Sequence, residues 1–242
     1  MDSQSQSNFK KITFFISLSL FFILLSYPLV RSASTALFYE HYSANDYSYA
    51  TFIGVVALMV LIFMSNKLQG RIGAQHLYFL TSLLSIFTLA GSLWGLQMNF
   101  KPAAYILFAT KEAYIVLLVH SCLAYANAYY SLINLKKFIG PIGAIGSIGG
   151  ILGGQLTTWI VASFGTNALL WTSFSFIIIS AAFFYGTRSE SIKGLKSGHS
   201  ITPLQAIRGV RKYILLIGAV VALSQFVIYL ADLQFNIVFE KI

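Results

Sequence analysis

Charged residues and cysteine are scarce in this sequence. Only 10% of its 242 residues are charged, whereas soluble domains average about 25%. An ordinary soluble domain is thereby excluded. The single cysteine, Cys122, excludes an intrachain disulfide, and its position inside an apolar run is typical of a residue that serves packing.

The sequence also lacks the patterns that carry catalysis. No metal-ligand spacing and no Ser-His-Asp arrangement occurs in it. The glycine run that ends at Gly154 continues with Gln155 and Leu156, whereas a phosphate-binding loop requires lysine followed by serine or threonine. We therefore expect no enzymatic activity, no metal and no other cofactor.

Hydrophobic residues, in contrast, make up 57% of the chain and gather in seven long runs. As a helix, about 20 residues cross the hydrocarbon core of a membrane. The first run also fits a secretory signal peptide, although the equally apolar later runs favour a retained helix. The pattern predicts an all-α membrane protein. The expected spans are residues 12–30, 49–66, 74–97, 102–132, 143–164, 168–185 and 213–235.

The positive charges are distributed unevenly around these runs. Twelve of the sixteen Lys and Arg residues fall on one side when successive loops are assigned to alternate sides of the membrane. The other side receives only Lys101 and Lys241, while Arg31 and Lys111 lie at membrane depth. Basic residues favour the cytoplasmic side, so the N-terminus is expected in the cytoplasm. Because the membrane accounts for most of the charge, no nucleic-acid partner is expected.

The order of the runs predicts a domain organisation. Residues 1–187 form a six-helix transmembrane bundle, residues 188–212 a basic cytoplasmic linker, and residues 213–242 a seventh transmembrane helix. Six helices followed by a long basic loop is the layout of one half of a major facilitator transporter, in which two bundles enclose a site near the midplane. The seventh helix would then begin a second bundle, so a second half-transporter is an expected partner.

The fourth run carries a polar stripe within its apolar sequence. On a helical wheel the stripe falls within about 100°, and such a stripe needs water, protein or a ligand in front of it. The helix is expected to turn at Lys136-Lys137. The stripe consists of Glu112, His120, Asn127, Ser131 and Asn134.

The fifth run is rich in glycine. Three pairs of glycines are spaced four residues apart, so a helix here presents a flat face against which a neighbouring backbone can pack closely. We expect this face to serve helix packing. Its residues are Gly146, Gly149, Gly150, Gly153 and Gly154.

Several segments, taken in order, resemble the ATP/ADP translocases of intracellular bacteria and plastids and their broader bacterial relatives. The segment that starts Lys111-Glu112 and continues to Val119, followed by Ala126-Asn127 and the glycine run, is similar to the fourth and fifth helices of that family. The segments around Arg31 and Asp232 are similar to its first and seventh helices. The segment at residues 66–74 resembles the major facilitator loop motif but matches it only in part.

The resemblance implies a secondary transporter that works by alternating access and moves a nucleotide, such as ATP or ADP, or another small anionic metabolite. It implies a location in the inner (plasma) membrane of a bacterium. In the nucleotide exchangers a lysine follows the arginine of the first helix, and Ser34 stands at that position here. Ala128 replaces an acidic residue. Fewer fixed charges would therefore face a polyphosphate.

Five residues are the candidates for substrate binding and translocation, and four of them also have a structural alternative. Asp232 either faces Arg31 across the cavity or lies near the outer interface in water. Arg31 either contacts an anionic substrate or lies near the outer interface, paired with Glu40 or Asp46. Lys111 and Glu112 could instead pair with Asp232 and Arg31 and hold helices together. His120 is either a proton carrier or a hydrogen-bonded packing residue. The candidates are Arg31, Glu112, His120, Asn127 and Asp232.

A second class of function stays open at this point. The chain could be a carrier remnant that does not transport, or a membrane partner subunit that dimerises through the glycine face of the fifth run. Coding sequence for about five further spans after Ile242 would favour the transporter.

Overall fold

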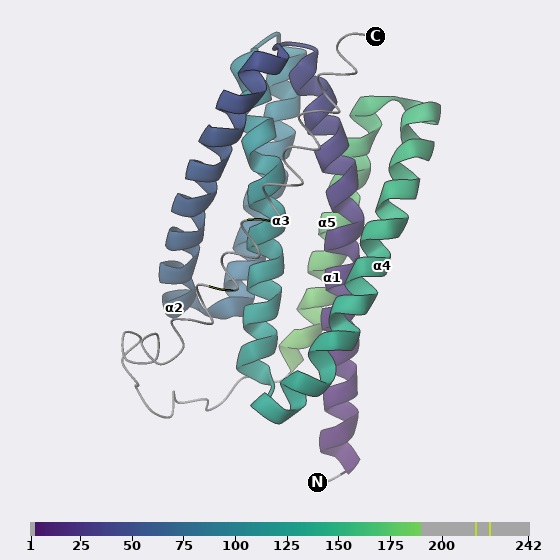
Figure 1. Cartoon of the computed structure of the whole chain (residues 1–242). Coiled ribbons are helices and arrows are strands. Elements are labelled where there is room, and N and C mark those ends of the chain that lie inside the picture. The colour runs from purple at the N-terminus through teal and green to yellow at the C-terminus, as the bar shows by residue number, and fades with distance from the viewer. Residues whose placement is uncertain (1–2, 190–215, 217–222, 224–242) are drawn as a thin grey trace. The chain divides into compact units, whose positions relative to one another are not determined.

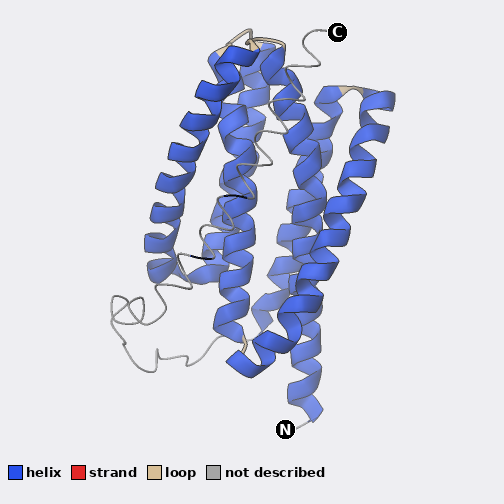
Figure 2. Ribbon diagram, viewed as in Figure 1, coloured by secondary structure: helices blue, strands red, loops and turns tan. Residues whose placement is uncertain are grey.

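A computed structural model of the chain describes residues 3–189 together with residues 216 and 223. The chain divides into two units, Met1–Ser191 and Ile192–Ile242, and the first contains nearly all described residues. Within residues 3–189 the structure is helical apart from short turns, and no strand occurs there (Figure 2). The expected seventh helix at residues 213–235 and most of the expected linker at residues 188–212 lie outside the described residues.

Helix α1, Ser3–Tyr39, is longer than the span expected at residues 12–30. The apolar run stops at Pro28 and Arg31, but the helix continues through both residues. Membrane helices tolerate proline because neighbouring groups compensate for the lost backbone hydrogen bond. Arg31 therefore lies inside α1, two helical turns before its end.

Helix α2, Ala44–Gln97, contains both the second and the third expected span. It is broken at Gly73, whose φ of 80° and ψ of 160° are not helical. Figure 1 shows the chain reversing direction at the lower end of α2. We call residues 44–72 the outgoing arm and residues 74–97 the return arm. The expectation of six helices between residues 12 and 185 is thus corrected to five, because no loop separates these two spans.

The boundary between α3, Pro102–Tyr129, and α4, Leu132–Phe164, also differs from the expectation. Tyr130 and Ser131 have extended backbones, with ψ of 142° and 156°, and these two residues end one helix and begin the next. The turn expected at Lys136-Lys137 is wrong, since both lysines lie inside α4. Ser131 and Asn134 consequently do not continue the polar stripe of α3.

The α3–α4 junction is held to the beginning of α1. The hydroxyl of Tyr130 hydrogen-bonds with Thr13 Oγ1 at 2.6 Å. Burial raises the pKa of Tyr130. The neutral hydroxyl can therefore serve this bond over the physiological pH range.

Helix α5, Thr166–Tyr185, completes the bundle and is followed by a short 3-10 helix, η1, Gly186–Ser189. Helix α1 packs against α3, α4 and α5, while α2 packs mainly against α3 (Figure 1). A buried network joins α1, α2 and α5, because Tyr78 OH, Ser19 Oγ and Ser180 Oγ lie 2.6–3.0 Å from one another. In a membrane such polar groups have to be satisfied internally.

Five helices of the described part are long and apolar enough to cross a membrane. Large apolar side chains also cover outer surfaces of the bundle, as Phe52 and Phe63 do on the outgoing arm of α2, where each is 71% exposed. Large apolar surfaces of this kind are suited to lipid and not to water. Residues 3–189 are accordingly all-helical, and the chain is an integral membrane protein.

Candidate functional site

Charged and polar side chains meet where α1 packs against α3. Tyr27, Arg31 and Thr35 follow one another at intervals of four residues and therefore share one face of α1. The Tyr27 hydroxyl donates to Glu112 Oε2 at 3.2 Å, and Lys111 Nζ donates to Thr35 Oγ1 at 3.2 Å. Arg31, which is half-buried, thus lies on α1 between two polar contacts with α3. We call Arg31, Lys111 and Glu112 the charge cluster.

Lys111 is the most deeply buried charged residue of this cluster, with 3% of its surface exposed. Its Nζ lies 3.5 Å from the centroid of the Phe108 ring and 5.8 Å from that of Tyr47. A cation over an aromatic ring gains about 0.5–2 kcal/mol, most when it is desolvated. The ring and the Thr35 hydroxyl therefore offset part of the cost of burying this ammonium group.

Lys111 was not among the five candidates from sequence. Its position immediately before Glu112, inside an apolar run, was the available signal, because an ionisable residue at membrane depth is a functional-site hypothesis by default. The residue that the structural alternative paired with it, Asp232, lies outside the described residues.

Glu112 is half-buried and accepts its hydrogen bond from Tyr27, one helical turn before Arg31. Glu112 therefore contacts a tyrosine, whereas the structural alternative paired it with Arg31. With two positive and one negative side chain, the charge cluster carries a formal excess of positive charge.

An additional buried hydroxyl lies next to these groups in the sequence. Ser34 is fully buried, and its Oγ makes no hydrogen bond. Buried hydroxyl groups without a partner are uncommon in folded proteins. Ser34 is the residue that stands where the resembled exchangers have a lysine, and it directly precedes Thr35, the partner of Lys111.

Aromatic rings cover the charge cluster on the side of the α1–α2 connection. The ammonium of Lys111 lies over the ring of Phe108. The centroid of this ring lies 4.9 Å from that of Phe38 and 5.1 Å from that of Tyr47. Tyr42 and Tyr105 extend this ring cluster, with centroids 4.6 Å apart. The rings pack α1, α2 and α3 together and exclude water from one side of Lys111.

Two of the sequence candidates lie away from the charge cluster. His120 follows Glu112 by eight residues, about 12 Å along the helix axis, and its Nε2 lies 3.0 Å from Asn66 Oδ1 of α2. Asn127 is exposed and lies near the end of α3. The structure thus brings Glu112 to the helix that carries Arg31 but spreads His120 and Asn127 along α3, and Asp232 is outside the described residues.

The glycine face of α4 packs against α1. A Cβ added to Gly149 would collide with the backbone oxygen of Phe21, and one added to Gly153 with that of Leu25. Gly146 meets the side chains of Leu20 and Leu24, whereas nothing lies within 4 Å of the Cβ position of Gly154. Gly150 has only one neighbour, at 4.0 Å. Most of this face is therefore covered by α1 of the same chain.

Among residues 3–189, no three His, Cys, Asp or Glu side chains gather in a way that could hold a metal ion. Comparison of the chain with protein-family models, curated proteins and solved structures gave no significant match. The functional argument consequently rests on the charge cluster and its surroundings.

Proposed function

We propose that the chain belongs to a secondary transporter that works by alternating access and moves a small anionic metabolite. The observation that carries this proposal is the buried Lys111, which lies inside an apolar helix next to Glu112 and donates to Thr35, one helical turn from Arg31 on α1. Charged side chains are costly in a membrane and typically mark substrate or ion pathways. Arginine and lysine are residues that bind anions such as phosphate, which supports an anionic substrate.

In this proposal the bundle is of the major facilitator type. The two arms of α2 count as separate crossings, so that residues 3–185 cross the membrane six times, with the N-terminus in the cytoplasm of a bacterium. The resemblance of the segments around Arg31, Glu112 and Asn127 to the ATP/ADP translocases makes a nucleotide such as ATP or ADP the first substrate to test. Arg31 and Lys111 would contact its phosphates.

The packing of α4 favours this proposal over a partner subunit that dimerises through the glycine face. That alternative needs an accessible face, and α1 already occupies Gly146, Gly149 and Gly153. A glycine-lined contact between α1 and α4 instead holds the helix that carries Arg31 at a defined position.

The test is uptake of radiolabelled ATP, ADP and inorganic phosphate by vesicles that contain the complete transporter, that is, the chain together with the second bundle that completes it. Wild-type protein is expected to accumulate at least one of these anions, and Arg31→Ala is expected to abolish uptake without loss of membrane insertion. Lys136→Ala is the control, because Lys136 is an exposed basic residue of α4 outside the charge cluster. Full uptake by Arg31→Ala would show that Arg31 is not part of the substrate site. No uptake by the wild type would contradict the proposal.

A further inference from the structure

Helices α1 and α4 lie side by side and begin at the same end of the bundle (Figure 1). Gly149 of α4 lies against the backbone of Phe21 of α1. Gly153 lies against that of Leu25, four residues further along both helices, so the two helices run parallel in one register. Because the register continues towards their first turns, residues near the start of α4 lie at the level of residues near the start of α1.

Ring contacts show the same alignment directly. The ring centroids of Phe9 and Tyr130 lie 6.0 Å apart, and those of Tyr130 and Phe138 lie 5.7 Å apart. The ring of Tyr130, at the α3–α4 junction, thus contacts one ring from the beginning of α1 and one from the beginning of α4. Its hydrogen bond with Thr13 holds this junction to α1.

Four lysines flank these rings, and all four are exposed. Two of them directly follow Phe9 on α1, and the other two directly precede Phe138 on α4. The two helices therefore each bring a pair of ammonium groups to one level of the bundle. We call these four residues the lysine surface: Lys10, Lys11, Lys136 and Lys137.

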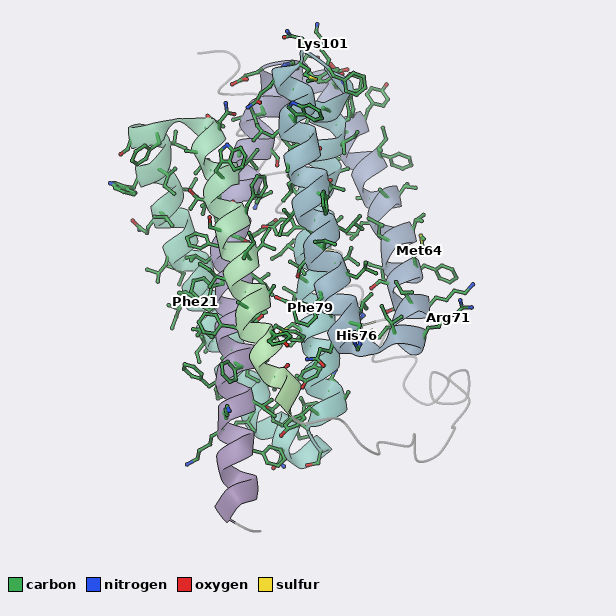
Figure 3. All side chains as sticks on the ribbon, turned by 180° about the vertical axis from the view of Figure 1, so that it is seen from behind. Phe21, Met64, Arg71, His76, Phe79 and Lys101 are labelled. Atoms are coloured by element: carbon green, nitrogen blue, oxygen red, sulfur yellow. The ribbon has the colours of Figure 1, made fainter. Side chains whose placement is uncertain are left out.

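Among the described residues, no carboxylate is placed to neutralise the lysine surface. Between residues 3 and 189 the acidic residues are Glu40, Asp46 and Glu112. The first two follow the end of α1 and begin α2, at the opposite end of the bundle, where Figure 3 shows Lys101. Glu112 contacts Tyr27, about 24 Å further along α1 than Lys11. The lysine surface is thus suited to an anionic partner.

The lysine surface lies where both helices leave the hydrocarbon core. The apolar stretches Phe9–Tyr39 and Asn134–Phe164 each have 31 residues, which extend for about 46 Å, whereas the core is about 30 Å thick. All four lysines belong to the first four residues of these stretches, so they reach the level of the lipid headgroups. Exposed apolar side chains follow at once, namely Phe14 on α1 and Ile139 on α4, which are 60% and 38% exposed. A lipid at this position would meet ammonium groups with its headgroup and apolar side chains with its acyl chains.

We propose that the lysine surface is a binding site for an anionic phospholipid of the adjacent membrane leaflet. The headgroup phosphate accepts hydrogen bonds from ammonium groups of both helices, and the acyl chains lie along the apolar residues that follow. Basic groups gathered between membrane helices are a known means of binding anionic headgroups. The site lies far along α1 from the charge cluster, so this proposal and the transport proposal can fail independently.

The test is lipid retention by the full chain, measured by native mass spectrometry after purification in detergent. Phosphatidylglycerol and phosphatidylcholine are added in equal amounts, and retention of phosphatidylglycerol in preference to phosphatidylcholine is expected. One variant combines Lys10→Gln with Lys11→Gln, and a second combines Lys136→Gln with Lys137→Gln. Each should weaken phosphatidylglycerol binding roughly thirtyfold, because one basic residue near the membrane surface contributes about a factor of five.

The matched control combines Lys67→Gln with Arg71→Gln. It also removes two exposed positive charges, but from α2, which packs mainly against α3. The control should retain phosphatidylglycerol as the wild type does. An equal loss in the control and in the two lysine variants would show general attraction by positive charge in place of a site, and would overturn the proposal.

Two further results would also overturn the proposal. One is equal retention of the two lipids by the wild type. The other comes from an arm in which inorganic phosphate is added at millimolar concentration without lipid. If phosphate protects the wild type but neither lysine variant against unfolding, and phosphatidylglycerol is not preferred, the lysine surface binds a soluble anion. Circular dichroism and size-exclusion chromatography check that each variant is folded.

Discussion

The free-energy cost of burying a lysine as deeply as Lys111 depends on the groups around its ammonium. Here these are the Phe108 ring at 3.5 Å and the Thr35 hydroxyl at 3.2 Å. All these groups lie in a low-dielectric environment, where electrostatic interactions are strong. An anionic ligand would gain from this arrangement, whereas folding would gain little from it, because replacing buried charges by apolar groups of similar volume is often neutral or stabilising.

This contrast leads to a prediction for Lys111→Met, which preserves the shape of the side chain. Uptake of the anionic substrate should fall more than tenfold, because a charge that contacts the substrate contributes more than about 1.4 kcal/mol. The free energy of unfolding in detergent should change by less than about 1 kcal/mol or increase. Uptake in vesicles and a denaturant titration measure the two quantities. Lys137→Met on an exposed part of α4 is the control, and a large loss of stability in Lys111→Met would identify Lys111 as structural.

At the scale of the elements, the contact between α1 and α4 depends on two glycines whose backbones approach α1. We predict that Gly149→Ala destabilises the protein by about 1–3 kcal/mol, because the new Cβ meets the backbone oxygen of Phe21, which cannot move aside cheaply. Gly154→Ala has open space and should be neutral or stabilising by up to about 1 kcal/mol. Equal effects of the two substitutions, measured by unfolding in detergent, would contradict the packing of α4 on α1.

The reversal within α2 depends on one residue. Gly73 has a φ of 80° and a ψ of 160°, a conformation almost confined to glycine. Gly73→Ala should therefore cost about 1–3 kcal/mol through backbone strain, although nothing lies within 4 Å of its Cβ position. Gly70→Ala is the control, since Gly70 has equally open space and lies in regular helix. If both variants unfold at the same denaturant concentration, the break does not depend on the conformation of Gly73.

The sequence predicted the presence of the elements better than their ends. Apolar runs located the helices because hydrocarbon thickness sets their minimum length. Pro28 interrupts the run but not the helix, because membrane helices tolerate proline. The α3–α4 junction was missed because Tyr130 and Ser131 give no glycine or proline signal, although their backbones are extended.

For the candidate site, the sequence indicated individual residues but not the contacts between them. Charge within an apolar run was enough to single out Arg31 and Glu112. The contact between Lys111 and Thr35, however, depends on how α1 and α3 are rotated against each other, and a single sequence does not contain that rotation. For the same reason the wheel placed His120 and Glu112 on one stripe, although their partners belong to different helices, α2 and α1.

At the scale of the whole bundle, α2 determines how many times the chain crosses the membrane. Its apolar stretch, Asp46–Gln97, has 52 residues, which extend for about 78 Å at about 1.5 Å per residue. The hydrocarbon core is only about 30 Å thick. A single crossing would leave most of this stretch in water, so two crossings that reverse at Gly73 are required. Ser43 and Asn99 should then lie on one side of the membrane and Gly70 on the other.

The single cysteine makes this prediction straightforward to test. Cys122 is buried, and Cys122→Ser provides a background without thiols. In intact cells a membrane-impermeant maleimide should label Ser43→Cys and Asn99→Cys, whereas Gly70→Cys should react only after the membrane is opened, because the basic Gly73 end belongs in the cytoplasm. The inverse pattern would preserve the reversal and overturn the orientation. Labelling of all three positions from one side would contradict the reversal itself, and with it the six crossings on which the transporter proposal depends.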